Sequence, residues 1–476
     1  MRRTLAAIAL SFNLLFAAPS SDPVLRSEVK TAMRRAAEFF RTQVTVQGGY
    51  LWRYSEDLSL REGEGKATAT MAWVQPPGTP SVGMAFLDAH RATGDAYYLD
   101  AARQTAHALV SGQLRSGGWD YLIEFDPALR PKYAYRFNGD AGGKNVTTLD
   151  DDNTQSALRL LMRVDEALKF KDEKIHETAL FALGSLLAAQ YPNGGWPQRF
   201  EHPPDPDRFP TKRASYPESW SRTYPAVDYR GYYTFNDNTI ADMIETMFLA
   251  SRIYRNSGYR KSAEKAAGFI LLAQMPEPQP AWAQQYDADM HPAWARKFEP
   301  PAVTGGESQG VLEILLTLYR ETGDPKYLEP VPRAIAYLRR SRLAGGTLAR
   351  FYELKTNQPL YFTKDYTLTY SDVDMPTHYA FKVADRLDKI ESEYQGLQRS
   401  RSGKSEPSRS STRIDSAETL ARQARNVIGA LDERGRWVEE GQLRFQGDSS
   451  VRRIINCRTF VENMRTLVRY LEATKP

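Results

Sequence analysis

Two stretches of this chain decide how the rest of it is interpreted: "SGQLRSGGWDYL", residues 111–122, and "AQYPNGGWPQRF", residues 189–200. Each contains a Gln, a short polar gap, a Gly-Gly-Trp and further aromatic residues, and each follows a helix-like segment. Looser copies, each a helix-like segment followed by a Gly- or aromatic-containing stretch, lead to "PAWAQQYD" and "AGGTLARFYE", and weaker ones to "GGYLWRY" and "ERGRWVEE". Such self-similarity is typical of a repeat architecture. We therefore expect one unit to recur, made of a helix, a Gly/aromatic segment, a loop and a second helix.

The second helices carry their apolar residues on one face. In "NTIADMIETMFLA" the apolar residues recur three and four positions apart, and "NTQSALRLLMRVDEAL" has the same spacing. No comparable run of alternating strands is found. Six helix pairs around a closed ring would bury these faces against one another. The pattern predicts an all-α fold, an (α/α) toroid or barrel of repeated helical hairpins whose long decorated loops form one catalytic rim.

The Gly-Gly-Trp motif is interpreted as structural. Gly pairs let the backbone turn sharply, and Trp119 and Trp196 stack where the chain enters the loop. Because all second helices of a toroid point the same way, the loops before them gather on one rim. The acidic stretches "TTLDDDNT" (147–154) and "TFNDNT" (234–239) would then face the basic stretches "ARKFEPPAVTGGES" and "LARFYELKTNQPLYFTKD" across one cleft.

The ends of the chain and one internal segment differ in composition from the repeats. Residues 1–20 combine a basic start, an apolar run too short to span a bilayer and small residues, which predicts an export signal peptide. The catalytic toroid domain is expected at 21–397, a disordered polar insertion at 398–413, and C-terminal helices that complete the toroid at 414–476. We thus expect a secreted or periplasmic protein without a membrane span once the signal is removed.

The bulk properties narrow the function further. The 476 residues can bury a large core, and the net charge of +5 comes from scattered Lys and Arg, which argues against a nucleic-acid groove and suits a polyanionic substrate. Cys457 is the only cysteine, so no internal disulfide forms, and its helical context predicts a buried packing role. Zinc-protease spacing and a Gly-x-Ser-x-Gly elbow are absent, and His291 and His378 are interpreted as ordinary loop residues.

Three adjacent carboxylates, Asp150, Asp151 and Asp152, stand directly before a second helix, and Asp237 lies at the corresponding place in the next unit. One of them can cap the free amides of the helix. Neighbouring carboxylates repel one another unless a cation offsets their charge, and such oxygen ligands suit Ca²⁺ above all. The residues alone leave helix capping and metal binding both open.

Two basic residues, Arg296 in "ARKFEPP" and Arg350 in "ARFYE", precede the next two second helices. Arg pairs with carboxylates through two parallel hydrogen bonds and stacks on aromatic faces. A single Arg of this kind is commonly part of a surface ion pair. Two such segments at the same rim favour binding of an acidic ligand.

Four motifs in order, "NGGWPQRF", "YYTFNDNT", "ARKFEPPAVTGGES" and "LARFYELKTNQPLY", resemble the pectate lyases of polysaccharide lyase family 10. The resemblance extends over residues 25–471 and includes the C-terminal "IINCRTFVENMRTLVRYL". It implies a toroid-like barrel, usually of three hairpins and so fewer than the six pairs expected above. It also implies cleavage of polygalacturonate by β-elimination, with Ca²⁺ bound between the protein and a substrate carboxylate.

The resemblance assigns roles to individual residues. Asp150 and Asp151 match the acidic metal pair of the family, and Asp237 matches the acid of its Tyr/Phe-Asn-Asp motif. Arg296 falls at the place of the catalytic base. Because the pKa of Arg exceeds ~12 in water, an Arg base implies an alkaline optimum and a cationic neighbourhood that favours its neutral form.

Substrate binding is assigned to Arg350, Lys364, Asn236 and Lys144. Lys364 stands in "FTKD", where the family often has an Arg that clamps a substrate carboxylate, and Lys keeps the charge without the fork. The loop at 201–230, rich in Pro and aromatic residues, is expected to form a wall over the cleft. We expect a monomer that binds the acidic polysaccharide polygalacturonate and no nucleic acid.

Two other functions are consistent with the same residues. An inverting glycoside hydrolase on an α/α toroid needs an acid and a base carboxylate, for which Asp150 and Asp237, joined by Glu299 or Glu307, would serve. A non-catalytic uronate-binding protein would use the same Arg and aromatic rim. The products discriminate between these functions, because a lyase leaves a double bond that absorbs ultraviolet light and a hydrolase does not.

Overall fold

The computed structural model describes residues 22–401, 416–447 and 450–475. The predicted signal peptide at 1–20 lies outside the described residues, and so do residues 402–413 of the predicted polar insertion. Residues 398–401, which were expected to be the start of that insertion, form the last turn of a helix instead.

Twelve α-helices lie within these ranges, and they occur in six consecutive pairs as the repeat predicts. The first helices are α1 (Pro23–Phe39), α3 (Ala96–Gly112), α5 (Glu173–Ala188), α7 (Ser257–Ala273), α9 (Val331–Arg340) and α11 (Ala417–Gly429). The second helices are α2 (Thr79–Thr93), α4 (Asn153–Ala167), α6 (Thr239–Tyr254), α8 (Glu307–Thr322), α10 (Leu387–Arg401) and α12 (Cys457–Ala473). The implied barrel of only three hairpins is therefore wrong for this chain.

Short helical turns decorate the connections. They are the π-helical η1 (Phe40–Val44) and the 3₁₀ turns η2 (Arg130–Lys132), η3 (Asp150–Asp152), η4 (Pro206–Arg208), η5 (Asn236–Asn238) and η6 (Pro325–Tyr327). Two of them, η3 and η5, run directly into α4 and α6. The predicted acidic residues thus lie at the N-terminal ends of two neighbouring second helices.

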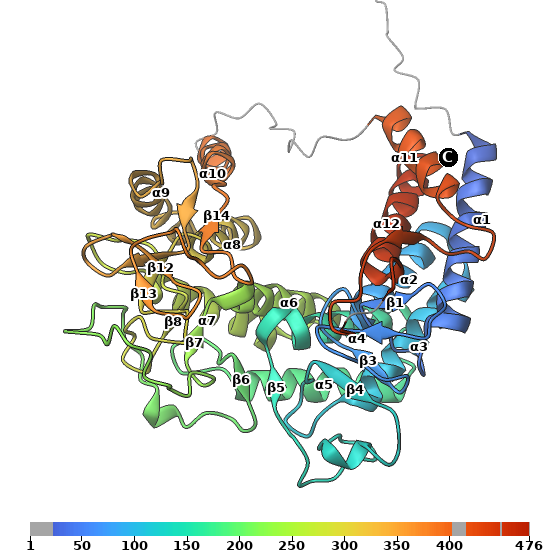
Figure 1. Ribbon diagram of the computed structural model, residues 1–476, viewed down its shortest axis with the longest axis horizontal. Helices are drawn as coiled ribbons and strands as arrows, with labels where there is room; N and C mark the ends of the chain where they lie inside the picture. The colour runs from blue at the N-terminus through green and yellow to red at the C-terminus, as the bar shows by residue number, and fades with distance from the viewer. Residues whose placement is uncertain (1–21, 402–415, 448–449, 476) are drawn as a thin grey trace, which may run out of the picture.

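The second helices pack side by side in the order α12, α2, α4, α6, α8, α10, which explains why each needs a continuous apolar face. Figure 1 shows them lining the inside of an arc, with α12 on one arm, α10 on the other and α6 between them. The all-α toroid class is confirmed. The predicted closed ring is not, because the arc is open between the fifth and sixth pairs.

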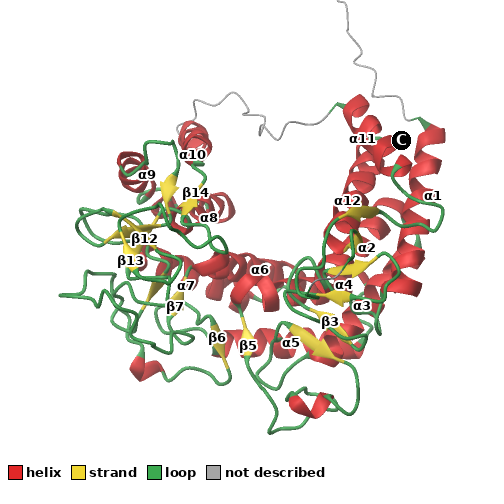
Figure 2. Cartoon of the chain, viewed as in Figure 1, coloured by secondary structure: helices red, strands yellow, loops and turns green. Residues whose placement is uncertain are grey.

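The connections also contain short strands, drawn as yellow arrows in Figure 2, that the sequence did not reveal. They are β1 (Arg53–Ser55), β2 (Arg61–Glu62), β3 (Met71–Trp73), β4 (Leu122–Glu124), β5 (Thr147–Thr148), β6 (Arg199–Phe200), β7 (Tyr233–Thr234), β8 (Gln285–Tyr286), β9 (Ala302–Thr304), β10 (Leu348–Ala349), β11 (Phe351–Glu353), β12 (Pro359–Phe362), β13 (Leu368–Thr369), β14 (Lys382–Val383), β15 (Val438–Glu440) and β16 (Arg453–Asn456). None exceeds four residues, so none shows an alternating pattern of apolar residues.

These strands join neighbouring units. The strand before the second helix of one unit pairs antiparallel with the strand after the first helix of the next: β3 with β4, β5 with β6, β7 with β8 and β9 with β11. The last unit pairs back to the first through β16 and β1. In the fifth unit β14 pairs with β10 of the same unit, and this is the place where the arc is open.

The two Gly-Gly-Trp motifs anchor the second and third units to their neighbours. Trp119 and Trp196 are fully buried, and their Nε1 atoms donate to carbonyls of the preceding helices at 2.8 Å, so the structural interpretation is confirmed. Gly117 and Gly194 have φ of +108° and +100°. A Cβ at Gly194 would come within 2.1 Å of the Lys265 carbonyl in the next unit. Only Gly fits where one unit turns against the next.

Two apolar clusters hold the molecule together. The larger runs through all helix pairs and includes the buried Cys457, as predicted. A smaller aromatic cluster around Trp294 and Phe351 fills the connection before α10, and Trp220 from the predicted wall loop packs against it. Within the described ranges, no helix has the length and apolar character needed to cross a membrane.

Candidate metal and catalytic site

The loops that precede α4 and α6 have nearly the same backbone conformation. Leu149 and Phe235 both have φ of −102° and ψ of −1°, and the turns η3 and η5 follow them. Asp151 (φ 54°, ψ 33°) and Asp237 (φ 47°, ψ 39°) are both left-handed. Residues other than Gly rarely adopt this region, although Asp and Asn tolerate it, and such conformations gather at functional sites.

Because the two loops share a backbone conformation, their residues can be matched position by position. Thr148 Oγ1 accepts from the amide of Asp150 at 3.3 Å, and Thr234 Oγ1 accepts from the amide of Asn236 at 3.0 Å. Asp150 and Asn236 are therefore equivalent, and Asp151 is equivalent to Asp237. A Thr two residues before each acidic turn is the local reason for the shared geometry.

Three predicted metal ligands converge in this register. One carboxylate oxygen each from Asp150, Asp151 and Asp237 lies within 4.8 Å of the others. Asn236 Nδ2 joins the two loops, since it donates to Asp150 Oδ1 at 3.1 Å and to Asp237 Oδ2 at 2.6 Å. Asn236, predicted as a substrate-binding residue, thus bridges the acidic cluster.

Burial and mutual repulsion within the cluster act mainly on Asp151 and Asp237. Burial, followed by repulsion from Asp150, raises the pKa of Asp151 to about 6 and that of Asp237 to about 7. Glu307 adds to the repulsion at Asp237. Such a group of carboxylates favours either protons or a hard cation.

Arg296 lies directly against the cluster. Its Nη2 donates to Asp150 Oδ2 at 3.0 Å, its Nη1 donates to Glu299 Oε1 at 3.0 Å, and its backbone amide donates to Glu299 Oε2 at 3.0 Å. Burial alone would lower the pKa of Arg296, but the carboxylates of Glu299 and Asp150 raise it above the ordinary value. The expected cationic neighbourhood is therefore wrong for these contacts, which are with anions.

Two residues of the opening stretches join the site, and the sequence did not single them out. Tyr121 OH lies 3.2 Å from an oxygen of Asp150 and 3.2 Å from an oxygen of Asp151. Arg199 Nη2 lies 3.6 Å from Asp150 Oδ2, the same oxygen that Arg296 binds. Each follows a Gly-Gly-Trp closely, so the repeated segment contributes residues to the site as well as to the packing of the fold.

The second basic stretch reaches the same rim. Arg350 Nη1 donates to Glu307 Oε1 at 2.8 Å and to Tyr379 OH at 3.2 Å, and Tyr379 OH donates to Glu299 Oε1 at 2.9 Å. Glu299 is 2% exposed and links this network to Arg296. The predicted meeting of acidic and basic stretches at one rim therefore holds for Arg296 and Arg350.

The two predicted substrate-binding lysines have other partners. Lys144 Nζ lies 2.6 Å from Asp120 Oδ2. Lys364 Nζ lies 3.1 Å from Asp374 Oδ1, and its side chain is 70% exposed. Neither contacts the acidic cluster.

The wall loop packs beside Arg296. Ser221 accepts from Trp294 Nε1 at 2.8 Å, and Arg222 forms an ion pair with Glu353. Burial raises the pKa of Tyr229, and the charge of Arg296 lowers it in part, so this tyrosine lies close to the guanidinium. The loop thus covers the segment that carries Arg296.

Comparison with protein families matches residues 134–348 to the pectic acid lyases. The matched segment contains Asp150, Asp151, Asp237 and Arg296 and ends just before Arg350. It confirms the predicted resemblance. The curated proteins include no match to this chain.

Solved structures give weaker likenesses. A family 10 polysaccharide lyase from Cellvibrio cellulosa is 20% identical over 66% of this chain and 97% of its own, with a TM-score of 0.46. A mutant of the family 10 lyase from Cellvibrio cellulosa, in complex with trigalacturonic acid, is 19% identical over 66% and 98% with a TM-score of 0.47. A D-mannose isomerase is 15% identical over 96% and 100% with a TM-score of 0.45.

Proposed function

We propose that this polysaccharide lyase, whose residues 134–348 match the pectic acid lyases, cleaves polygalacturonate by Ca²⁺-assisted β-elimination with Arg296 as the base. The products would be unsaturated oligogalacturonides. The observation that carries the proposal is the 3.0 Å hydrogen bond from Arg296 Nη2 to Asp150 Oδ2. It brings the candidate base to the edge of the candidate metal cluster. In a uronate, the hydrogen that is removed is on the carbon next to the carboxylate, so base and metal must lie close together.

The acidic cluster suits a calcium ion. Ca²⁺ takes oxygen ligands at about 2.3–2.6 Å, so two ligand oxygens on one ion are at most about 5 Å apart. The oxygens of Asp150, Asp151 and Asp237 lie within 4.8 Å of one another. Burial, and then repulsion from Asp150, raises the pKa values of Asp151 and Asp237, so a bound cation would stabilise their charged forms. These three residues would hold the ion.

Calcium, when bound, supplies positive charge that neutralises the uronate carboxylate and lowers the pKa of the neighbouring guanidinium. Arg296 then accepts the proton from the carbon next to that carboxylate. The electron pair of the broken C–H bond forms a double bond to the neighbouring carbon. The bond from that carbon to the glycosidic oxygen breaks, its electrons stay on the oxygen, and the oxygen takes up a proton from solvent, to which Arg296 afterwards returns the proton that it accepted. No water is consumed.

An Arg base must first lose its own proton, and the contacts of Arg296 decide how costly that is. Asp150 and Glu299 both stabilise the charged form, so high pH favours the reaction. Arg199, 3.6 Å from the same oxygen of Asp150, keeps that carboxylate neutralised when Arg296 turns to the substrate. Glu299 holds the Arg296 backbone as well as its side chain and so limits how far it moves.

The geometry speaks against the inverting hydrolase. Inverting enzymes separate their two carboxyl groups by about 6.5–9.5 Å to admit a water. Asp150 and Asp237 have oxygens within 4.8 Å, and Glu299 already accepts from Arg296 and Tyr379. A non-catalytic uronate-binding protein differs from the proposal only in turnover.

Ultraviolet absorbance of polygalacturonate, followed at several alkaline pH values with Ca²⁺ present, tests the proposal. We expect the wild type to generate the unsaturated product and Arg296→Ala to lose at least about a thousandfold in kcat while still binding the polymer. Arg260→Ala, on the exposed face of α7 beside Glu264, is the matched control. Undiminished elimination by Arg296→Ala would remove Arg296 from the role of base.

A further inference from the structure

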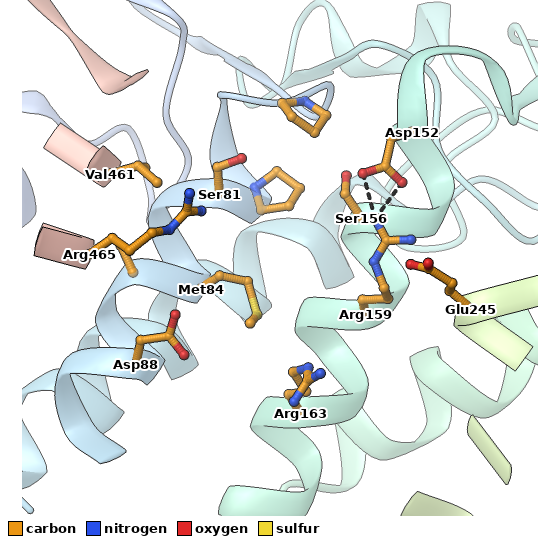
Figure 3. A pocket seen from close by; sticks show the side chains of 13 residues that line it. Ser81, Met84, Asp88, Asp152, Ser156, Arg159, Arg163, Glu245, Val461 and Arg465 are labelled. Carbon is orange, nitrogen blue, oxygen red and sulfur yellow. Dashed lines mark hydrogen bonds and ion pairs between the residues drawn. The ribbon is translucent and has the colours of Figure 1, made fainter. Parts of the chain in front are cut away.

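A cavity of about 410 Å³ lies on the concave side of the arc, outside the cluster described above. Figure 3 shows side chains from α2, α4, α6 and α12 around it. Its volume falls in the range of ~300–1,000 Å³ that is usual for small-molecule sites. The cavity brings together helices of the first, second, third and sixth units, which only the arc places side by side.

The cavity borders the acidic cluster. Asp152, which lines it, directly follows Asp151 in the turn η3. Ser156 lines it from the first turn of α4, and Ser81 lines it from the first turn of α2. The cavity therefore opens near the N-terminal ends of the second helices, the same ends that carry the candidate metal ligands.

Two arginines of the cavity are available to an anion. Arg163 on α4 and Arg465 on α12 line it, and within the described residues neither makes a hydrogen bond or an ion pair. Arg159, by contrast, is held by both oxygens of Asp152, as the dashed lines in Figure 3 mark. Asp88, which also lines the cavity, forms its ion pair with Arg91 at 3.2 Å and is attracted by Arg163 and Arg465 as well.

The rest of the lining suits a sugar ring. Glu245 and Ser81 offer acceptors and donors for hydroxyl groups, while Met84 and Val461 offer apolar surface. Arg binds carboxylates through two parallel hydrogen bonds. A uronate residue carries all three features at once: a carboxylate, hydroxyls and an apolar ring face.

We infer that this cavity is a second saccharide-binding site, in which Arg163 and Arg465 bind the carboxylate of a galacturonate residue remote from the bond that is cleaved. The inference rests on the proposed function, since it takes the substrate to be a galacturonate polymer. The site would anchor a long chain whose other residues reach the acidic cluster. A short chain fills only the cluster.

Steady-state kinetics on polygalacturonate and on trigalacturonate, with Ca²⁺ present, test this site. For the double variant Arg163→Gln/Arg465→Gln we expect KM on the polymer to rise about tenfold, with kcat on the trimer unchanged, because two charge-assisted contacts are lost. Arg260→Gln, whose partner Glu264 lies on the outer helix α7, is the control. Thermal melting should be unchanged in the double variant, since neither arginine has a bonding partner to lose.

An unchanged KM on the polymer in the double variant would overturn the inference. Calorimetric binding of polygalacturonate to the Ca²⁺-loaded protein separates this failure from failure of the proposed function. Absence of elimination by the wild type would contradict the proposed function. Equal affinity of the wild type and the double variant for the polymer would contradict the second site. Neutral galactan is the last probe. Equal affinity for galactan and polygalacturonate would also overturn the inference, because the arginines would then not recognise carboxylates.

Discussion

The loops before α4 and α6 share one backbone conformation but differ in their side chains. Asp152 and Asn238 share the left-handed conformation with φ of 57° and 60°, just as Asp151 and Asp237 do. The side chains differ at the first residue of each turn, Asp150 in one loop and Asn236 in the other, and again at the third, Asp152 and Asn238. In both units the same turn directs carboxylates toward the acidic cluster. The substitution of an amide for a fourth carboxylate gives the cluster an internal donor instead of further repulsion.

Removing either of the equivalent ligands should have the largest effect. Asp151→Asn and Asp237→Asn each delete one of three charged oxygen ligands, so we expect Ca²⁺ affinity to fall about a hundredfold in both. Isothermal titration measures it, with Asp374→Asn, an exposed carboxylate paired with Lys364, as the control. A loss in only one of the two variants would mean that the loops do not share an ion.

A substitution that makes the first residues of the two turns identical should have the next largest effect. Asn236→Asp removes the donor to Asp150 and Asp237 and adds a fourth carboxylate, so we expect the free energy of unfolding without Ca²⁺ to fall by about 2 kcal/mol. Added Ca²⁺ should restore most of that loss. Urea denaturation with and without the ion measures both. Stability equal to that of the wild type without Ca²⁺ would show that the amide is not needed as a donor.

The equivalent Asp151 and Asp237 also predict a pH dependence. Their pKa values, about 6 and about 7, lie above the ordinary 3.8, so the folded metal-free protein binds protons more tightly than the unfolded chain. This contribution is complete below pH ~4 and is lost as the pH rises through 6 and 7. We expect unfolding without Ca²⁺ to become about 2 kcal/mol easier over that range, while Ca²⁺ affinity rises.

Calorimetric melting from pH 4 to 8 measures this prediction. Asp237→Asn should flatten the upper part of the curve, because it removes the group with the higher pKa. A metal-free protein whose melting temperature does not fall between pH 4 and 7 would contradict the raised pKa values of Asp151 and Asp237.

The third residues of the turns should matter least. Asp152→Asn makes the first loop resemble the second at this place and breaks the ion pair with Arg159. The side chain of Arg159 is 22% exposed and that of Asp152 is 27% exposed. A partly exposed pair contributes up to about 1 kcal/mol, so we expect a loss in unfolding free energy of that size. Ca²⁺ affinity should change by less than about twofold, and a large drop would place Asp152 among the ligands.

The fold was predictable where the signal repeats. Six copies of the Gly/aromatic segment predicted six helix pairs, and the apolar face of each second helix predicted their side-by-side packing. The opening of the arc was not predictable, since it depends on β14 pairing with β10 within its own unit. Strands of two to four residues are too short to leave a pattern.

The site was predictable where a chemical motif and the repeat register agreed. Asp150, Asp151, Asp237 and Arg296 meet, although Arg296 is 146 residues from Asp150. Tyr121, Arg199, Glu299 and Tyr379 were missed or given other roles, because nothing in a single Tyr, Arg or Glu indicates which distant side chain it contacts. Lys364 was assigned because it stands where the family often has an Arg, and both Lys144 and Lys364 have a carboxylate partner elsewhere.

We propose that the carboxylates of Asp150, Asp151 and Asp237 hold one divalent ion on which elimination depends. Following ultraviolet absorbance of polygalacturonate before chelation, after exhaustive chelation and after Ca²⁺ is added back tests it most directly. We expect product formation by the wild type to stop on chelation and to return with Ca²⁺, and we expect Asp237→Asn not to recover at the same Ca²⁺ concentration. Full activity in the chelated wild type would contradict it.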